Sequence, residues 1–195
     1  LDVRHEHDFA KGHIPKSIFI GLDGDFAPWV GALIADVEQP ILLVTPKGRE
    51  EEAVTRLSRV GFDNTLGYLK GSFEAWKEAQ KEYDDLSTVS PQQFAEKMKA
   101  NIKIIDVRKP SEYQAERIEN AENIPLDFLN ERLAELPKDD TFYVHCAGGY
   151  RSVIASSILK ARGMHNMINV EEGFDVLKTI DKIPKTSYVC PTTLK

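Results

Sequence analysis

The most constraining feature of the sequence is an internal duplication. Residues 1–4, Leu-Asp-Val-Arg, recur as Ile-Asp-Val-Arg at residues 105–108, an offset of 104 residues. Near the end of each copy, Gly71-Ser72-Phe73 parallels Gly173-Phe174, with one residue inserted. Self-similarity at a fixed period indicates that one structural unit is built twice. The sequence therefore predicts two similar domains, over residues 1–82 and 86–185, followed by a C-terminal tail over residues 186–195.

Each copy alternates segments typical of strands with segments typical of helices. In the second copy Ser90 and Pro91 indicate a helix start, with serine as the cap and proline in the first turn. Strands are predicted over residues 102–107, 121–124, 142–145 and 167–170, and helices over 91–98, 110–113, 126–136, 152–162 and 173–179. Such alternation predicts an α/β fold in which a small, mostly parallel sheet carries helices on both faces.

The first copy begins directly at its Asp-Val-Arg strand, so it lacks a counterpart of residues 88–104. We therefore expect this domain to be incomplete at its N-terminus. The polar and acidic run from Lys81 to Ser87 is typical of a linker between two domains.

A cysteine-containing loop connects the strand at 142–145 to the helix at 152–162. Two glycines let this loop curl, so that its N–H groups turn toward the sulfur of Cys146. The positive end of the helix dipole adds to the effect, and both favour the nucleophilic thiolate. Arg151 supplies a cation that keeps its proton. The pattern predicts a nucleophilic cysteine in an anion-binding loop; a buried structural cysteine in a turn is the alternative.

The length of this loop separates two chemistries. Four residues lie between Cys146 and Arg151. Cysteine-dependent phosphatases use a similar cradle that is one residue longer and wide enough for a tetrahedral phosphate. The shorter loop better fits a single extra sulfur atom on the cysteine, so sulfur transfer is expected and phosphate-ester hydrolysis is the competing hypothesis.

The matching loop of the first copy has no thiol. The strand at 41–44 leads into Thr45-Pro46-Lys47-Gly48-Arg49-Glu50, and the cysteine position falls on Val44 or Thr45, depending on where the gap is placed. Pro46 also removes one N–H group from the loop. We expect this copy to lack cysteine chemistry and to brace the second copy.

The sequence Cys-Ala-Gly-Gly-Tyr-Arg-Ser, the helix after it and the later Gly-Phe pair resemble the active site of the rhodanese family of sulfurtransferases. The resemblance implies two rhodanese-like domains, a degenerate first one beside a competent second one. It also implies that a sulfane sulfur atom moves from a persulfide, polysulfide or thiosulfate donor to a thiophilic acceptor through a persulfide on Cys146. A non-catalytic binding or regulatory module within a larger sulfur-metabolism protein is the alternative. Similar tandem modules follow metallo-beta-lactamase-fold dioxygenase domains, so a fused or partner metallo-hydrolase domain is a further expectation.

The same resemblance assigns roles within the loop. Cys146 carries the sulfur, and Arg151 acts electrostatically or binds carbonyl groups of its own loop. Ser152 is expected to cap the helix. The loops of thiosulfate-using relatives are strongly cationic, and Tyr150 departs from that pattern. This departure favours a persulfide as the donor. The residues expected to bind the substrate are Ala147, Gly148, Gly149, Tyr150 and Ser152.

Other polar residues are expected to be structural. Asp106 and Arg108 recur as Asp2 and Arg4 in the copy without a thiol, which argues against a catalytic role. His145 precedes the cysteine on a strand, so its side chain points to the opposite face, which favours a histidine in the core or behind the site over a general base.

No metal or cofactor is expected. His5, His7 and Asp8 could be metal ligands, but they align with Lys109, Ser111 and Glu112, which favours a solvated helix start. The sequence contains no phosphate-binding loop, dinucleotide fingerprint or zinc pattern.

Charge and cysteine content narrow the expected partners. The net charge of −6 argues against nucleic acid and anionic membranes. No apolar run approaches the roughly 20 residues that span a bilayer. Cys146 and Cys190 are the only cysteines, and a nucleophile needs a free thiol, so a reducing cytoplasm is expected. The expected partners are small sulfur donors and acceptors.

Overall fold

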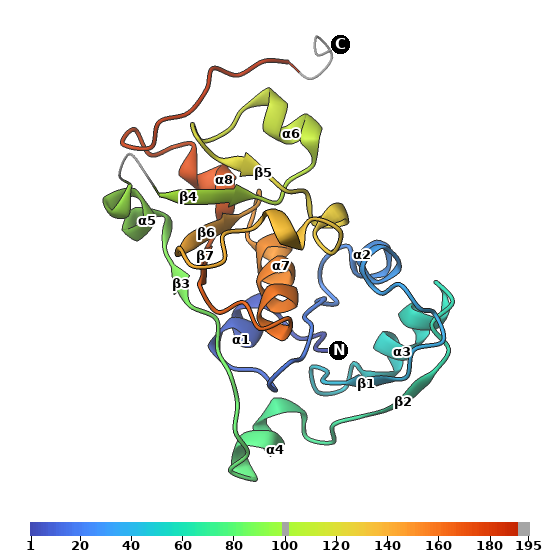
Figure 1. The fold of residues 1–195 in the computed structure, drawn as a ribbon. Helices are drawn as coiled ribbons and strands as arrows, with labels where there is room; N and C mark the ends of the chain where they lie inside the picture. The colour runs from blue at the N-terminus through green and yellow to red at the C-terminus, as the bar shows by residue number, and fades with distance from the viewer. Residues whose placement is uncertain (99–101, 191–195) are drawn as a thin grey trace. The chain divides into compact units, whose positions relative to one another are not determined.

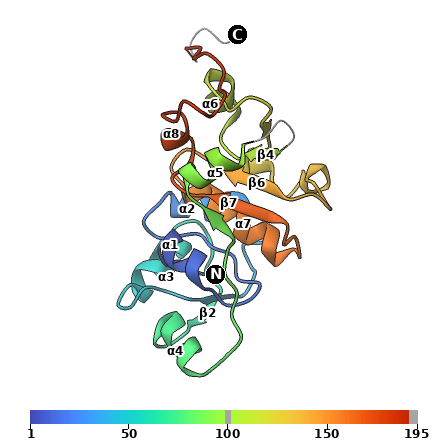
Figure 2. The same cartoon turned by 90° about the vertical axis from the view of Figure 1, so that its left-hand side faces the viewer.

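A computed structural model describes residues 1–98 and 102–190. The chain divides into two compact units, Leu1–Leu86 and Ser87–Lys195. Both units place strands and helices in alternation, as Figure 1 and, after a quarter turn, Figure 2 show. This confirms the predicted α/β fold class.

The second unit is built on a five-stranded parallel sheet in the order β3-β7-β6-β4-β5. Its strands are β3 (Thr88–Val89), β4 (Lys103–Asp106), β5 (Glu122–Asn123), β6 (Phe142–His145) and β7 (Met167–Val170). Its helices are α5 (Pro91–Lys97), α6 (Pro110–Ala115), α7 (Tyr150–Ala161) and α8 (Gly173–Leu177). All four residues of the central strand β6 are buried, which is typical of a parallel strand covered on both faces.

One face of this sheet is covered by α5 and α8. Phe94 of α5 packs edge-on against Tyr143 of β6, with ring centroids 5.2 Å apart. These residues belong to a buried cluster that also contains Ile104, Val170 and Phe174. The start of α5 is fixed as the sequence predicts, because Ser90 and Gln93 form a capping box and proline occupies the first turn.

The prediction of a helix over residues 126–136 is wrong. The segment forms two short 3₁₀ turns, Leu126–Phe128 and Leu133–Glu135. Leucines three residues apart also share one side of a 3₁₀ turn, so Leu126 and Leu129 are both buried without a continuous helix. The spacing of the leucines thus predicted correctly that Leu126 and Leu129 are buried, but it did not predict the 3₁₀ conformation of the backbone.

The first unit repeats the centre of this arrangement. Its elements are α1 (Glu6–Lys11), α2 (Phe26–Leu33), β1 (Ile41–Leu43), α3 (Glu50–Ser58), β2 (Thr65–Tyr68) and α4 (Ser72–Glu78). Strands β1 and β2 pair in parallel. Asp2 forms parallel bridges with both Phe19 and Val44. Asp2 therefore takes the place of β4, which lies between β5 and β6 in the second unit.

Two predicted connecting segments are partly ordered by backbone pairing. In the predicted linker 81–87, Asp84 pairs with His13 and the amide of Leu86 donates to the carbonyl of Ala10. In the predicted tail, the amides of Thr186 and Val189 donate to the carbonyls of Arg117 and Ala115.

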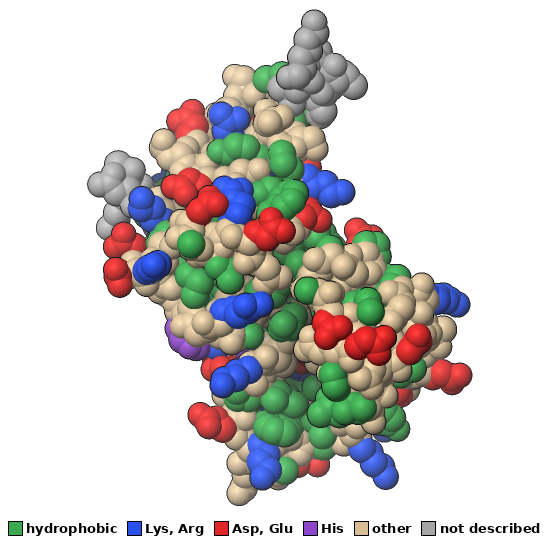
Figure 3. All heavy atoms as spheres, turned by 45° about the vertical axis from the view of Figure 1, so that its right-hand side comes forward, with side chains coloured by type: hydrophobic (Ala, Val, Ile, Leu, Met, Phe, Trp, Pro, Cys, Tyr) green, Lys and Arg blue, Asp and Glu red, His purple; other side chains and the backbone are tan. Residues whose placement is uncertain are grey.

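The face of the molecule shown in Figure 3 carries acidic and basic side chains interspersed with hydrophobic ones. Across residues 1–98 and 102–190, the helices are all too short or too polar to traverse a bilayer.

Candidate active site

Cys146 stands where β6 ends and the loop into α7 begins, at the carboxyl edge of the parallel sheet, where ligands bind in open α/β sheets. Its side chain is buried, at 1% exposure. The amide of Gly149 donates a hydrogen bond to Cys146 Sγ at 3.2 Å. At the loop tip Gly148 is exposed, so solvent reaches the loop two residues from the sulfur. The sulfur therefore faces a loop amide, as the sequence predicts.

The start of α8 holds the back of this loop. The amide of Phe174 donates to the Cys146 carbonyl at 2.7 Å, and the amide of Asp175 donates to the Ala147 carbonyl at 3.0 Å. Gly173 makes the approach possible, because a Cβ at this residue would lie 2.5 Å from both carbonyl oxygens. Its φ of +56° also favours glycine. The late Gly-Phe pair of the sequence is thus part of the loop's support.

The helix α7 begins at Tyr150, two residues earlier than predicted. Gly149, with a φ of +101°, is its N-cap. Ser152 is therefore not the cap: it is fully buried in the first turn, where its hydroxyl donates to the Gly149 carbonyl at 2.8 Å. Tyr150 is half-buried at the first helical position. The role of Ser152 that the structure shows is to fix the backbone of Gly149, whose amide faces the sulfur.

Arg151 binds a carboxylate from another element. Its two terminal nitrogens donate to Glu112 Oε2 and Oε1, at 2.6 and 2.9 Å. The sequence led us to expect that Arg151 either acts electrostatically or binds carbonyl groups of its own loop. The ion pair adds a third contact, because two of its nitrogens donate to Glu112. Burial opposes ionisation of Glu112, but the hydrogen bonds and charge of Arg151 outweigh it and hold the pKa of the carboxyl below its usual range. The hydrogen bonds that Arg151 donates to Glu112 in turn raise the pKa of Arg151.

Beneath the loop lies a buried pair, Asp106 and Arg108. The guanidinium of Arg108 donates to both carboxylate oxygens of Asp106 and to the Glu116 carbonyl, and it stacks 3.9 Å from the centroid of the Phe174 ring. In the first unit Arg4 does the same with Asp2. The recurrence in a unit without a thiol supports the structural role predicted for the pair.

His145 is a core histidine, as strand alternation predicts. It is fully buried, its Nδ1 lies 3.2 Å from the Cys146 carbonyl oxygen, and its Nε2 lies 3.8 Å from Asp106 Oδ2. Burial lowers the pKa of His145, against the attraction of Asp106.

This burial has a measurable consequence for stability. Below its ordinary pKa of 6.5 the imidazole of His145 takes up a proton in the unfolded chain before it does in the folded one. The unfolded state then binds more protons, so the free energy of unfolding falls as the pH drops, by up to about 1.4 kcal/mol per pH unit. We expect His145→Leu to flatten this slope in urea unfolding between pH 7.5 and 5.5. The exposed-histidine control His165→Asn should keep it; a slope unchanged by His145→Leu would refute the assignment.

The strand register identifies the counterpart of the nucleophile in the first unit. Asp2 pairs with Val44 as Asp106 pairs with His145, so the next residue, Thr45, occupies the position of Cys146. This resolves the choice between Val44 and Thr45. The Thr45 side chain is buried, at 1% exposure, and carries a hydroxyl where the second unit carries a thiol.

Residues 1–79 and 90–179 each match the family model of the rhodanese-like domain. The chain belongs to the rhodanese-like family. The two matches fall on the two structural units and confirm that both copies are rhodanese-like domains.

Several known proteins resemble parts of this rhodanese-like chain. The thiosulfate sulfurtransferase PspE of Escherichia coli is 42% identical over 67 residues, which is 33% of this chain and 64% of the relative. The putative sulfur carrier protein YrkF of Bacillus subtilis is 33% identical over 87 residues, 44% of this chain and 47% of the relative. A crystal structure of a rhodanese-related protein from Thermoplasma volcanium is 30% identical, with a TM-score of 0.47, and covers 51% of this chain and 97% of its own. The chain thus spans about half the length of curated relatives such as YrkF, and 56% of the protein YqhL of Bacillus subtilis.

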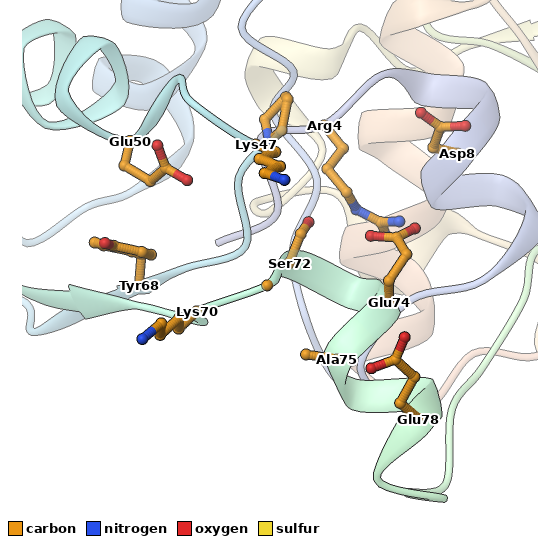
Figure 4. A pocket seen from close by; sticks show the side chains of 12 residues that line it. Arg4, Asp8, Lys47, Glu50, Tyr68, Lys70, Ser72, Glu74, Ala75 and Glu78 are labelled. Atoms are coloured by element: carbon orange, nitrogen blue, oxygen red, sulfur yellow. The ribbon is translucent and has the colours of Figure 1, made fainter.

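In the first rhodanese-like unit a pocket of about 700 Å³ lies over the altered loop. Figure 4 shows Lys47 and Ser72 near its centre, with Glu74 and Glu78 to one side and Lys70 to the other. Ser72 takes the place of Gly173, and its hydroxyl donates to the Thr45 carbonyl at 2.6 Å. The first unit therefore has a pocket at the position that corresponds to the Cys146 loop, and acidic and basic side chains line it.

The histidine group near the chain start resembles a helix cap more than a metal site. His5 caps α1, and its Nδ1 accepts a hydrogen bond from the His7 amide. Potential ligand atoms of His5, Glu6 and His7 lie within 4.8 Å of one another, whereas Asp8 is not part of that group. The solvated helix start remains the interpretation for these residues.

Sequence reasoning missed one functional candidate, Glu112. Its contact with Arg151 joins residues 39 positions apart, which no local pattern reveals. One signal was present, because the repeat aligns Glu112 with the acidic Asp8. An acidic residue at the same position of both copies, at the start of the same helix, indicates a role for its carboxylate.

Proposed function

We propose that the second unit transfers sulfane sulfur through a persulfide on Cys146. The observation that carries this proposal is the hydrogen bond from the Gly149 amide to Cys146 Sγ, at 3.2 Å, in a loop at the head of α7. Amides turned toward the sulfur stabilise negative charge on it and on a second sulfur bonded to it. The similarity to sulfurtransferases supports the same chemistry.

The reaction proceeds in two displacements, each balanced in atoms and electrons. Cys146 thiolate attacks the outer sulfur of the donor, a new S–S bond forms, and the bond between that sulfur and the donor breaks, so the donor leaves as a thiolate or as sulfite. A thiophilic acceptor then attacks the outer sulfur of the persulfide, and the S–S bond electrons return to Cys146. This is covalent, two-step catalysis with no external oxidant.

Within this proposal the loop residues bind the transferred sulfur. The amides of Ala147, Gly148, Gly149, Tyr150 and Ser152 surround the persulfide, and Arg151 provides positive charge at the end of the loop. Because Glu112 already neutralises Arg151 through two hydrogen bonds, the loop presents less free positive charge than the sequence suggests. A dianionic donor such as thiosulfate loses more binding energy through this neutralisation than a singly charged persulfide does.

A donor panel tests this proposal. Reduced protein is treated with thiosulfate, an inorganic polysulfide or a small-molecule persulfide, and the mass of the peptide containing Cys146 is measured. We expect an increase of one sulfur atom, fastest with the persulfide. Glu112→Gln keeps the size of the side chain and one of its two acceptor oxygens but removes the negative charge, so it should raise the rate with thiosulfate relative to persulfide by roughly tenfold, as a change of about 1.4 kcal/mol implies. Absence of the sulfur adduct with every donor would refute sulfur transfer.

The first unit, in our proposal, is a non-catalytic companion. The supporting observation is Thr45 at the position of the nucleophile, because its hydroxyl lacks the acidity of a thiol. Two broader expectations also remain proposals. The first is a reducing compartment such as the cytoplasm, which keeps Cys146 a thiol. The second is a metallo-hydrolase domain in the same protein or in a partner, and the gene sequence adjoining this chain tests it.

A further inference from the structure

The pocket of the first unit has opposite charges on its two sides. Lys47 lies near its centre and Lys70 on one side, whereas Glu74 and Glu78 lie on the other side (Figure 4). Within residues 1–98 and 102–190, none of these four side chains forms an ion pair or a hydrogen bond. Exposed charges are ordinary on a protein surface, but here unpaired charges of both signs line one pocket and remain available to a ligand.

The positive side of the pocket is specific to the first unit. By strand register, Tyr68 of β2 takes the position of Asn169 of β7, because each pairs with the corresponding residue of the neighbouring strand. Two residues further on, Lys70 therefore stands where the second unit has Glu171. This reversal of charge separates the pocket from its counterpart and indicates a ligand different from that of the Cys146 loop.

Two buried side chains at the pocket have hydrogen-bonding capacity to spare. Arg4 lines the pocket and is 5% exposed. Its Nε and Nη2 donate to Asp2 and to the Gly12 carbonyl, whereas Nη1 has no acceptor among the described residues. The hydroxyl of Thr45 is buried without a hydrogen-bond partner in the same part of the chain, and the next residue, Pro46, lines the pocket. A ligand that brings carbonyl or carboxylate oxygens would satisfy such donors.

The size of the pocket limits the ligand. Its volume of about 700 Å³ lies within the roughly 300–1,000 Å³ of pockets for drug-sized molecules, so a single small ion would leave most of it empty. The half-exposed ring of Tyr68, together with Pro46 and Ala75, offers apolar surface to the uncharged body of a ligand. Glu50 also lines the pocket, but its carboxylate accepts a hydrogen bond from the Gly48 amide at 3.2 Å.

From these charges, donors and dimensions we propose that the pocket of the first unit binds a short zwitterionic peptide, about three residues long. The C-terminal carboxylate of the peptide binds Lys47 and Lys70, and its N-terminal ammonium group binds Glu74 and Glu78. A peptide carbonyl between the two ends accepts a hydrogen bond from Nη1 of Arg4. The two glutamates disfavour an inorganic anion, which would meet their negative charge without offering a cation in return.

Blocked peptides test this inference on the intact chain. Trialanine, its N-acetylated form and its C-terminal amide are titrated into the isotope-labelled 195-residue protein, and the amide signals of Gly71 and Ser72 are followed by NMR. We expect saturable shifts with trialanine and a dissociation constant in the millimolar range. Blocking either end should weaken binding about fivefold, as loss of an ion pair that water can reach does at the upper end of its range.

Charge variants assign each end of the peptide. In Lys70→Met the amide should bind as well as trialanine, and in the double variant Glu74→Gln/Glu78→Gln the acetylated form should bind as well as trialanine. Lys81→Met and Glu51→Gln are matched controls, because both residues are exposed in the same unit and lie outside the pocket; they should keep the full effect of blocking.

Three results would overturn the proposal. They are equal binding of the free and blocked peptides, sulfate binding as tightly as trialanine, and no saturable shift at Gly71 and Ser72 up to about 20 mM peptide, well above the expected dissociation constant. The second result would assign the pocket to simple anions. None of these measurements involves a sulfur donor, so the inference stands or falls separately from the proposed activity of Cys146.

Discussion

Cys146→Ser is expected to abolish sulfur transfer, lowering the rate by roughly a thousandfold or more, as removal of a covalent nucleophile does. The serine hydroxyl fits the space of the thiol and can accept the same hydrogen bond from the Gly149 amide, now made to Cys146 Sγ at 3.2 Å. It does not ionise near neutral pH and forms no persulfide. The measurement is thiocyanate formation from cyanide and the chosen donor, together with the thermal unfolding midpoint, which should change little.

A paired exchange sharpens this prediction. Thr45→Cys in the Cys146→Ser background places a thiol at the corresponding position of the first unit. We expect no recovery of activity, because Pro46 supplies no N–H to the loop, and because Glu50 begins α3 where the second unit has the uncharged Tyr150. Recovery of substantial activity would show that the first unit retains a competent loop, and it would contradict its assignment as non-catalytic.

The sequence predicted the parts of this molecule that depend on local pattern or on repetition. The paired Asp-Val-Arg strands revealed the duplication, and the structure gives Asp2–Arg4 and Asp106–Arg108 the same bidentate geometry. Strand alternation placed His145 in the core, since a residue beside Cys146 on β6 must point away from it.

What escaped prediction depends on long-range contacts. The partner of Arg151 is Glu112, and only the folded chain brings α6 to the loop. The two 3₁₀ turns in residues 126–136 share the leucine spacing of a helix, so hydrophobic periodicity alone does not distinguish them. The position of Thr45 required the strand register, because the loops of the two copies differ in length between strand and helix.

Gly173→Ala is expected to damage both stability and activity. An added Cβ would lie 2.5 Å from the carbonyl oxygens of Cys146 and Ala147, closer than such contacts occur, and a φ of +56° is unfavourable for alanine. The backbone must shift, and the amides of Phe174 and Asp175 that hold those two carbonyls shift with it. We expect a loss of about 1–3 kcal/mol in the free energy of unfolding and at least a tenfold slower formation of the Cys146 persulfide.

Gly163→Ala is the matched control, because it separates backbone strain from the close contact. Gly163 also has a positive φ, +87°, but a Cβ there would meet no atom within 4 Å. This variant should lose about 1 kcal/mol of stability through strain alone and form the persulfide at the parental rate. The first unit supports the distinction, because Ser72 takes the place of Gly173 there with a φ of +59° and donates to the Thr45 carbonyl. In this chain the position carries a side chain in the unit that has Thr45 and none in the unit that has Cys146. If Gly173→Ala and Gly163→Ala slowed persulfide formation equally, the close contact would not be what positions Cys146.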